Sequence, residues 1–154
     1  MPFYYPNWIN DFWRIMGLIH FGDKDHFCIP GEKRFDEALI RSFCTETGLA
    51  FYDTACEVRR LRDNASDAFL EVVSPSDIPA LLSRIPACDN LVTTGQKATE
   101  VIRDTLGCEI PPIGGFVDTL IDGRPIRFWR MPSTSRAYPL PLTQKAEAYK
   151  KLFV

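Results

Sequence analysis

The apolar residues of this 154-residue chain alternate between helical and strand-like spacing, and this alternation constrains the fold more than any other feature. Helical patterns are expected from Asn10 onward and over residues 35–47, 76–82, 96–106 and 143–153. Strand-like runs are expected over residues 49–53, 90–95, 116–121 and 125–130. This order predicts an α/β fold in which helices cover a largely parallel sheet.

Local signals set the ends of several predicted elements. Asn10 and Ser76 are suited to cap the helices that follow them, because their side-chain oxygens can accept hydrogen bonds from the first helical amides. Gly48 and Gly107 are expected to end helices. Asp122-Gly123 between two apolar runs predicts a tight β-hairpin. Residues 57–67 are rich in charge and are expected to be irregular.

Composition fits one domain covering residues 1–154, with 45% hydrophobic and 25% charged residues. No apolar run is long enough to predict a membrane span, and the start of the chain does not resemble a signal peptide. The five cysteines are widely spaced and form no CxxC pair, and there are two histidines. We therefore expect reduced thiols, a cytoplasmic location and no metal site.

Positive charge gathers at the end of an otherwise acidic chain. Residues 124–154 contain seven lysines and arginines and one acidic residue, a local charge of +6, although the whole chain carries −2. Such a distribution is typical of a protein that contacts phosphates. It also fits a solvated helix face next to strand ends.

Residues 133–137, Ser-Thr-Ser-Arg-Ala, follow a predicted core strand and precede the last predicted helix. The hydroxyls and amides of such a loop can donate hydrogen bonds to phosphate oxygens, and Arg136 adds charge. Ala137 or Tyr138 could enter a base stack as an apolar wedge. The alternative interpretation is a surface loop that its prolines make rigid.

Three other segments are weaker candidates for a site. The aromatic residues at the start, Tyr5 among them, could stack on a base or cover a sheet. Thr94-Gly95 ends a predicted strand where a helix begins, a position where α/β sheets often bind ligands. Asp53 also ends a predicted strand, and it could orient a water molecule or pair with the arginines that follow it.

Together these segments resemble the uracil-DNA glycosylase superfamily, nearest its mismatch-specific branch and related bacterial single-domain proteins. Tyr5 followed by Asn10-Asp11-Phe12-Trp13 is similar to that branch's aromatic residue and N-x-F-W helix start. The ending is the most specific part of the likeness: Trp129 to Ser135 resembles a W-x-L-P-S-T-S loop. Lys145-Ala146-Glu147-Ala148-Tyr149 resembles the K-x-x-E-A-Y helix after it.

The resemblance implies a three-layer α/β/α sandwich around a mainly parallel four-stranded sheet, whose first strand would be absent from this chain. It implies an enzyme that flips uracil or a related damaged or mismatched base out of duplex DNA and removes it by water attack at the sugar carbon. Tyr5, Thr94 and Gly95 would contact the base. The implied DNA contacts are Ser133, Thr134, Ser135, Arg136, Ala137 and Lys145.

Departures from the family pattern leave two hypotheses about activity open. The glycine-proline motif that positions water in the family has no counterpart here, so the catalytic residues stay unassigned, with Asn10 and Asp53 as weak candidates. Met131 replaces a histidine that some members carry, and Thr94 replaces a frequent asparagine. The chain is then either part of an active glycosylase or a catalytically inactive nucleic-acid-binding module. A third hypothesis is an unrelated α/β domain whose basic end binds an acidic partner.

Overall fold

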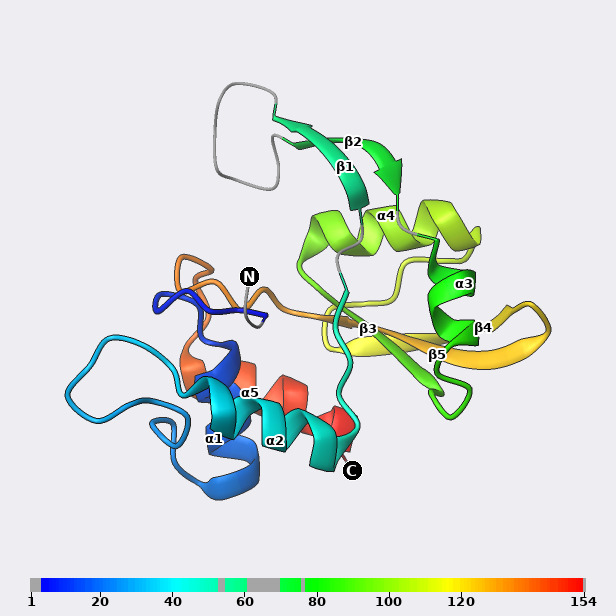
Figure 1. Cartoon of the computed structure of the whole chain (residues 1–154). Coiled ribbons are helices and arrows are strands. Elements are labelled where there is room, and N and C mark those ends of the chain that lie inside the picture. Colours follow the sequence, from blue (N-terminus) through cyan, green and yellow to red (C-terminus); the bar gives the residue numbers. More distant parts are fainter. Residues whose placement is uncertain (1–3, 53–54, 61–69, 76, 154) are drawn as a thin grey trace. The chain divides into compact units, whose positions relative to one another are not determined.

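A computed structural model describes residues 4–52, 55–60, 70–75 and 77–153, with the backbone alone described for residues 55–60 and 70–75. The chain divides into two compact units (Figure 1). Unit 1 combines Met1–Phe51 with Ser133–Val154, and unit 2 is Tyr52–Pro132. The two units are described separately.

Unit 1 is helical. It contains α1 (Phe12–Phe21), α2 (Glu37–Thr47), α5 (Leu142–Lys150) and the short 3-10 helix η2 (Lys151–Phe153). Asp36 caps α2, because its side chain accepts a hydrogen bond from the Leu39 amide. Gly22 and Gly48 end α1 and α2 with positive φ angles of 65° and 73°, which a glycine adopts without the steric cost of a Cβ atom.

Aromatic side chains join the three long helices of unit 1. Trp13 of α1 is 1% exposed and lies edge-on to Phe43 of α2, with ring centroids 6.4 Å apart. Phe12, next to it on α1, lies edge-on to Tyr149 of α5 at 6.2 Å. Helix α1 therefore contacts α2 through Trp13 and α5 through Phe12, and the three helices lie together in Figure 1. The core of unit 1 depends on rings from both ends of the chain.

Unit 2 is built on a three-stranded sheet in the order β3-β5-β4. Strand β3 (Asn90–Thr94) is parallel to β5 (Arg124–Met131), and β5 is antiparallel to β4 (Gly115–Ile121). The predicted hairpin is confirmed: Asp122 and Gly123, between β4 and β5, have φ angles of 52° and 76°. Positive φ at both positions is the requirement of a type I′ turn.

Two helices cover one face of this sheet. Ile78 and Leu82 of α3 (Ile78–Ser83) and Ile102 of α4 (Gln96–Leu106) form a cluster of buried side chains with three strand residues. The strand residues are Ile121, Ile126 and Phe128. Since these strand residues alternate with residues facing the other side, the sheet provides an apolar core face.

A further pair of strands, β1 (Ala55–Arg60) and β2 (Leu70–Pro75), is antiparallel and separate from the three-stranded sheet. The predictions here were wrong: residues 49–52 form no strand, and residues 57–60 are paired rather than irregular. Phe51 instead packs against Phe12 and Trp13, with centroid distances of 5.4 and 5.9 Å. Strand β1 was missed because its charged residues Glu57, Arg59 and Arg60 hide the apolar alternation by which a strand is predicted.

The α/β class is confirmed by this combination of helices with a sheet that has one parallel and one antiparallel pair. The helices over residues 35–47, 96–106 and 143–153 were predicted to within a few residues. Ser76 lies outside the described residues, and Asp77 caps α3 by accepting a hydrogen bond from the Ala80 amide.

Candidate nucleic-acid interface

The segment 133–137, called the 133–137 loop below, is attached to the residues that precede α1. The Asp11 amide donates to the Thr134 carbonyl at 2.8 Å, and the Arg136 amide donates to the Ile9 carbonyl at 3.1 Å. Asn10 and Ser135 form an antiparallel bridge between these bonds. The structure thus brings Asn10 and the loop together within unit 1.

The loop also uses its own hydroxyls and amides. The Ser133 Oγ accepts from the Ser135 amide at 3.2 Å, and the Ser135 Oγ accepts from the Ala137 amide at 3.3 Å. The amides of residues 135, 136 and 137 are therefore engaged within the protein. Each serine hydroxyl still has its proton to donate, so the hydroxyls are better suited than these amides to meet phosphate oxygens.

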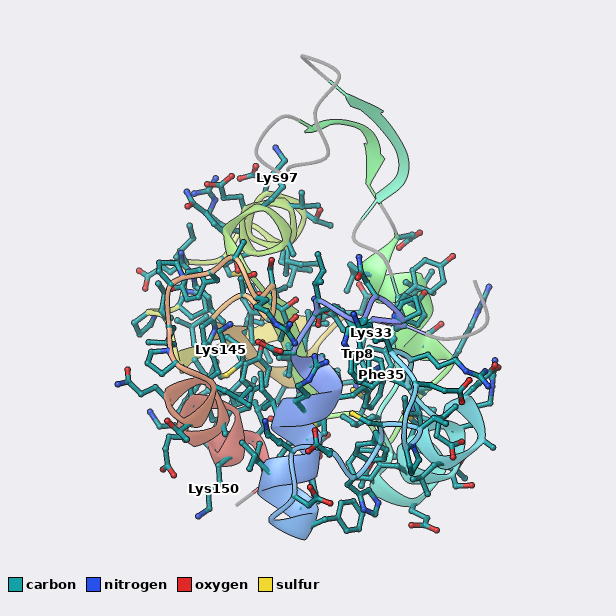
Figure 2. All side chains as sticks on the ribbon, turned by 90° about the vertical axis from the view of Figure 1, so that its left-hand side faces the viewer. Trp8, Lys33, Phe35, Lys97, Lys145 and Lys150 are labelled. Atoms are coloured by element: carbon teal, nitrogen blue, oxygen red, sulfur yellow. The ribbon has the colours of Figure 1, made fainter. Side chains whose placement is uncertain are left out.

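Lys145 supports the loop from inside. Its side chain is buried, 1% exposed, and its Nζ donates to the Ser135 carbonyl at 2.9 Å. The same Nζ lies 3.7 Å from Asp11 Oδ2 and 5.9 Å from the centre of the Tyr138 ring. Figure 2 shows Lys145 on α5. The resemblance assigned Lys145 to the DNA contacts, but these surroundings place its ammonium group beneath the loop. The Thr134 side chain is buried as well, at 2%.

Asp11 joins the basic residues of this region. Its Oδ1 accepts from Arg14 Nη1 at 3.1 Å and lies 3.6 Å from Arg136 Nη2. We call Asp11, Arg14, Arg136 and Lys145 the Asp11 cluster. The cluster holds one carboxylate and three cationic groups, a net charge of +2. Only the Arg136 side chain is largely exposed, at 52%.

Arg14 is fixed by aromatic and carbonyl groups as well as by Asp11. Its Nη1 donates to the Trp8 carbonyl at 2.9 Å and to the Asn10 carbonyl at 3.2 Å. Its guanidinium carbon lies 4.4 Å from the centre of the Trp8 ring and 5.2 Å from that of Phe35. Trp8 and Phe35 lie together in Figure 2. A planar guanidinium stacks on rings in this way, so Arg14 sets the shape of the segment before α1.

Tyr5 has a backbone conformation that side-chain-bearing residues rarely adopt, with φ of 55°. Its ring stacks on Phe12 with a centroid distance of 4.6 Å and an interplanar angle of 18°. Burial raises the pKa of Tyr149 well above its usual range, and the nearby Tyr5 adds to this rise. Strain of this kind persists only where the surroundings enforce it, and it often marks a functional position.

Thr94 and Gly95 belong to unit 2, whereas Tyr5 and the 133–137 loop belong to unit 1. Gly95 caps α4 with φ of 87°, and its amide donates to the Met131 carbonyl at 3.1 Å. Its carbonyl accepts from the Thr99 hydroxyl at 2.7 Å. These bonds hold the turn between β3 and α4 in one conformation. Met131, at the end of β5, is buried.

Of the two weak catalytic candidates, Asn10 is described and Asp53 lies outside the described residues. Asp11 is the N-cap residue of α1, one position after the predicted Asn10, and its side chain makes no capping hydrogen bond. The Asn10 Oδ1 accepts from the Phe12 amide at 2.9 Å. The oxygen is therefore committed to the helix start.

The basic residues of 124–154 are divided between the two units. In unit 2, Arg124 donates to the carbonyls of Leu82 and Ile85 at 2.9 and 3.0 Å. Arg127 pairs with Asp118 at 3.1 Å. Much of the charge counted in the sequence therefore stabilises local structure. In unit 1, Arg136 and Lys150 are exposed basic residues.

Sequence reasoning did not predict that Asp11 lies at the centre of this cluster. The signal that was present is the spacing of Asp11 and Arg14, since residues three apart at a helix start can pair. Nothing in the sequence indicated that Arg136 and Lys145 reach the same carboxylate.

Among the described residues, no group of three or more histidine, cysteine or acidic side chains could hold a metal ion. No helix in the described part of the chain is both long and apolar enough to cross a membrane. Comparisons with protein-family models, curated proteins and solved structures find no match to this chain.

Proposed function

We propose that this chain is a base-excision DNA glycosylase-type domain that binds duplex DNA through the 133–137 loop of unit 1. The observation that carries this proposal is the Asp11 cluster and its net charge of +2: Asp11, Arg14 and Lys145 together carry +1 behind the loop, and Arg136 adds +1 at the surface. Partly buried charges are screened less than exposed ones, so this excess attracts a phosphodiester strongly.

The cluster suits a cation that changes partners. Arg136 lies 3.6 Å from Asp11, a longer separation than that of the Arg14 pair. When Arg136 turns to a phosphate, Asp11 keeps Arg14 and Lys145 as partners. No buried carboxylate is left uncompensated, so the exchange avoids the large cost of an unpaired buried charge. The Ser133 and Ser135 hydroxyls would donate to the same backbone.

Base excision is the activity proposed with this binding, in line with the resemblance. Tyr5, already strained and stacked on one ring, would stack on a flipped uracil or related base. Ala137, exposed at the end of the loop, would fill the gap in the duplex. The three-layer sandwich with a four-stranded, mainly parallel sheet belongs to this proposal. We also propose that the protein is cytoplasmic and that its reaction needs no cofactor.

A catalytically inactive nucleic-acid-binding module is the second candidate, and one observation favours it. The polar side chains next to the loop are committed: the Asn10 Oδ1 accepts from the Phe12 amide, and Asp11 is held by cations. A general base needs a free acceptor within reach of the attacking water. Among the described residues of this region, neither side chain offers one.

The binding proposal is tested with Arg136→Ala and a duplex that contains one uracil. We expect the dissociation constant to rise about tenfold. The slope of log K against the logarithm of the salt concentration should become shallower by about 1, as for one lost phosphate contact. Arg41→Ala is the matched control, because Arg41 is an exposed arginine of unit 1 that pairs with Glu37. Unchanged affinity and slope in Arg136→Ala would contradict the role of the loop.

Excision is tested by incubating the chain with uracil-, hypoxanthine- and G·T-containing duplexes at low salt and measuring abasic product. Product that Tyr5→Ala reduces supports the glycosylase. Binding without product supports the inactive module. No binding to any duplex at low salt would reject both and leave an acidic protein as the partner to seek.

A further inference from the structure

The surroundings of Lys145 give it a part different from a phosphate contact. We infer that Lys145 and Asp11 form a buried latch that fixes the conformation of the 133–137 loop, and thereby the position of Arg136. This inference rests on the proposed function for its use, because an ordered loop matters to the DNA binding proposed above. The latch itself follows from contacts within unit 1 and can be tested without DNA.

The Lys145 ammonium group lies against the backbone of the loop. It donates to the Ser135 carbonyl at 2.9 Å, and that carbonyl also accepts from the Tyr138 amide at 3.0 Å. Ser135 is the middle residue of the loop and pairs with Asn10. With 1% exposure, Lys145 has no route by which its charge could meet a phosphate without the loop moving away. It is therefore a positioning residue.

Asp11 is the carboxylate that pairs with the buried ammonium group of Lys145. A buried ammonium group is costly unless it is paired, and Asp11 Oδ2 lies 3.7 Å from Lys145 Nζ. Asp11 also holds the loop by its backbone, because its amide donates to the Thr134 carbonyl. One residue thus binds the loop through its amide and neutralises the lysine beneath it.

The latch has a consequence for the position of Arg136. Its amide is fixed by the Ile9 carbonyl, and its guanidinium group is directed toward Asp11 Oδ1. A loop that is ordered before binding pays less conformational entropy on binding, so the latch raises affinity without touching the ligand. Loss of the latch should weaken binding through loop order, whereas loss of Arg136 should remove a contact.

Hydrogen exchange of the free protein tests the latch directly. The amides of Asp11, Ser135, Arg136 and Ala137 are hydrogen-bonded at the loop. In Lys145→Met we expect these amides to exchange at least about tenfold faster, while amides of α4 in unit 2 keep their rates. Lys150→Met, an exposed lysine of the same helix, is the control and should change neither set. Loop amides that keep their rates in Lys145→Met would overturn the inference, whether or not the protein binds DNA.

A paired substitution guards against general misfolding. Asp11→Asn leaves the buried Lys145 without its carboxylate, so it should speed loop exchange more than Lys145→Met does. Adding Lys145→Met to Asp11→Asn removes the unpaired ammonium group and should slow loop exchange again. The increase in exchange rate in the double variant is compared with the product of the increases in the two single variants. If the two are equal, the residues act independently and the latch is rejected.

DNA binding then separates positioning from contact. We expect Lys145→Met to weaken duplex binding about tenfold with an unchanged salt slope, whereas Arg136→Ala lowers the slope. A slope lowered by about 1 in Lys145→Met would show a direct phosphate contact and overturn the positioning role. Faster loop exchange in Lys145→Met together with a wild-type chain that binds no duplex would uphold the latch and reject the proposed function.

Discussion

The two units of this chain bury different kinds of side chains. Unit 2 has an apolar cluster in which two helices cover one face of a sheet, with Phe128 and Ile102 at 0% and 1% exposure. Unit 1 buries rings beside charged groups, including Arg14 at 6%, Asp11 at 7% and Lys145 at 1%. A buried apolar side chain needs close packing alone, but a buried charge also requires an oppositely charged or hydrogen-bonding partner. Unit 1 therefore holds several polar atoms in place, which the binding surface proposed above requires.

The largest expected effect concerns the apolar cluster of unit 2. Phe128→Ala removes a fully buried ring from the middle strand of the unit 2 sheet, and we expect the free energy of unfolding to fall by about 4 kcal/mol. Urea unfolding followed by circular dichroism measures it. Leu120→Ala on β4, 68% exposed, is the control and should change stability by less than about 0.5 kcal/mol. A loss below about 1 kcal/mol for Phe128→Ala would show that the cluster is not a close-packed core.

Arg14→Met tests the polar side. The substitution keeps an unbranched stem between Trp8 and Phe35 but removes the donors to the Trp8 carbonyl and to Asp11. We expect a loss of about 2 to 3 kcal/mol, less than for Phe128→Ala, because Asp11 keeps Lys145 and Arg136. The same urea unfolding measures it.

Arg14→Lys separates the two contributions of this side chain. Lysine keeps the charge but has neither a planar group to stack between rings nor a forked set of donors. It should therefore recover only part of the loss. Full recovery would mean that charge alone, and not the ring and carbonyl contacts, holds Arg14 in place.

The sequence predicted the parts of unit 2 that depend on local signals. The helix over residues 96–106 is α4 with the same bounds, and Gly107 ends it with φ of 66°. The hairpin at Asp122-Gly123 was likewise predicted from two residues. Such features follow from neighbours in the sequence, where spacing and turn chemistry decide the backbone.

The candidate site of unit 1 could be predicted only in part, because it joins three distant segments. The 133–137 loop was selected from its composition, whereas the N-cap of α1 was predicted one residue too early, at Asn10 rather than Asp11. The burial of Lys145 was not foreseen, because a lysine at the start of a helix usually points to solvent. Only the attachment of the loop to Asp11 places a carbonyl and a carboxylate around its ammonium group. The strand 55–60 was missed for a different reason: its partner is the next strand along the chain, but its charged residues hide the apolar alternation of a strand.

The smallest expected effect concerns His20, a half-buried side chain of unit 1 whose Nε2 atom, unlike the groups of the Asp11 cluster, has no hydrogen-bond partner among the described residues. Its Nε2 is buried without a hydrogen bond, and its ring lies edge-on to Phe43 at 4.9 Å and Phe153 at 4.5 Å. Burial lowers the pKa of His20 below its usual value of 6.5, because the rings cannot solvate the imidazolium. The unfolded chain therefore binds a proton at a higher pH than the folded chain does. Folding stability should then decrease as pH falls below about 6.5, until the pKa of the folded state is passed.

His20→Phe removes this titration and keeps a ring in the same place. The measurement is the difference in urea unfolding free energy between pH 7.5 and pH 5.5, compared between the substituted and unchanged chains, because carboxylates that titrate in both chains cancel. We expect the unchanged chain to lose more stability over this interval. An equal loss in both chains would mean that the folded chain takes up a proton at His20 as readily as the unfolded one. The rings of Phe43 and Phe153 would then not shield His20 from water. The Asp11 cluster would in that case have no unpaired buried group in unit 1 to be compared with.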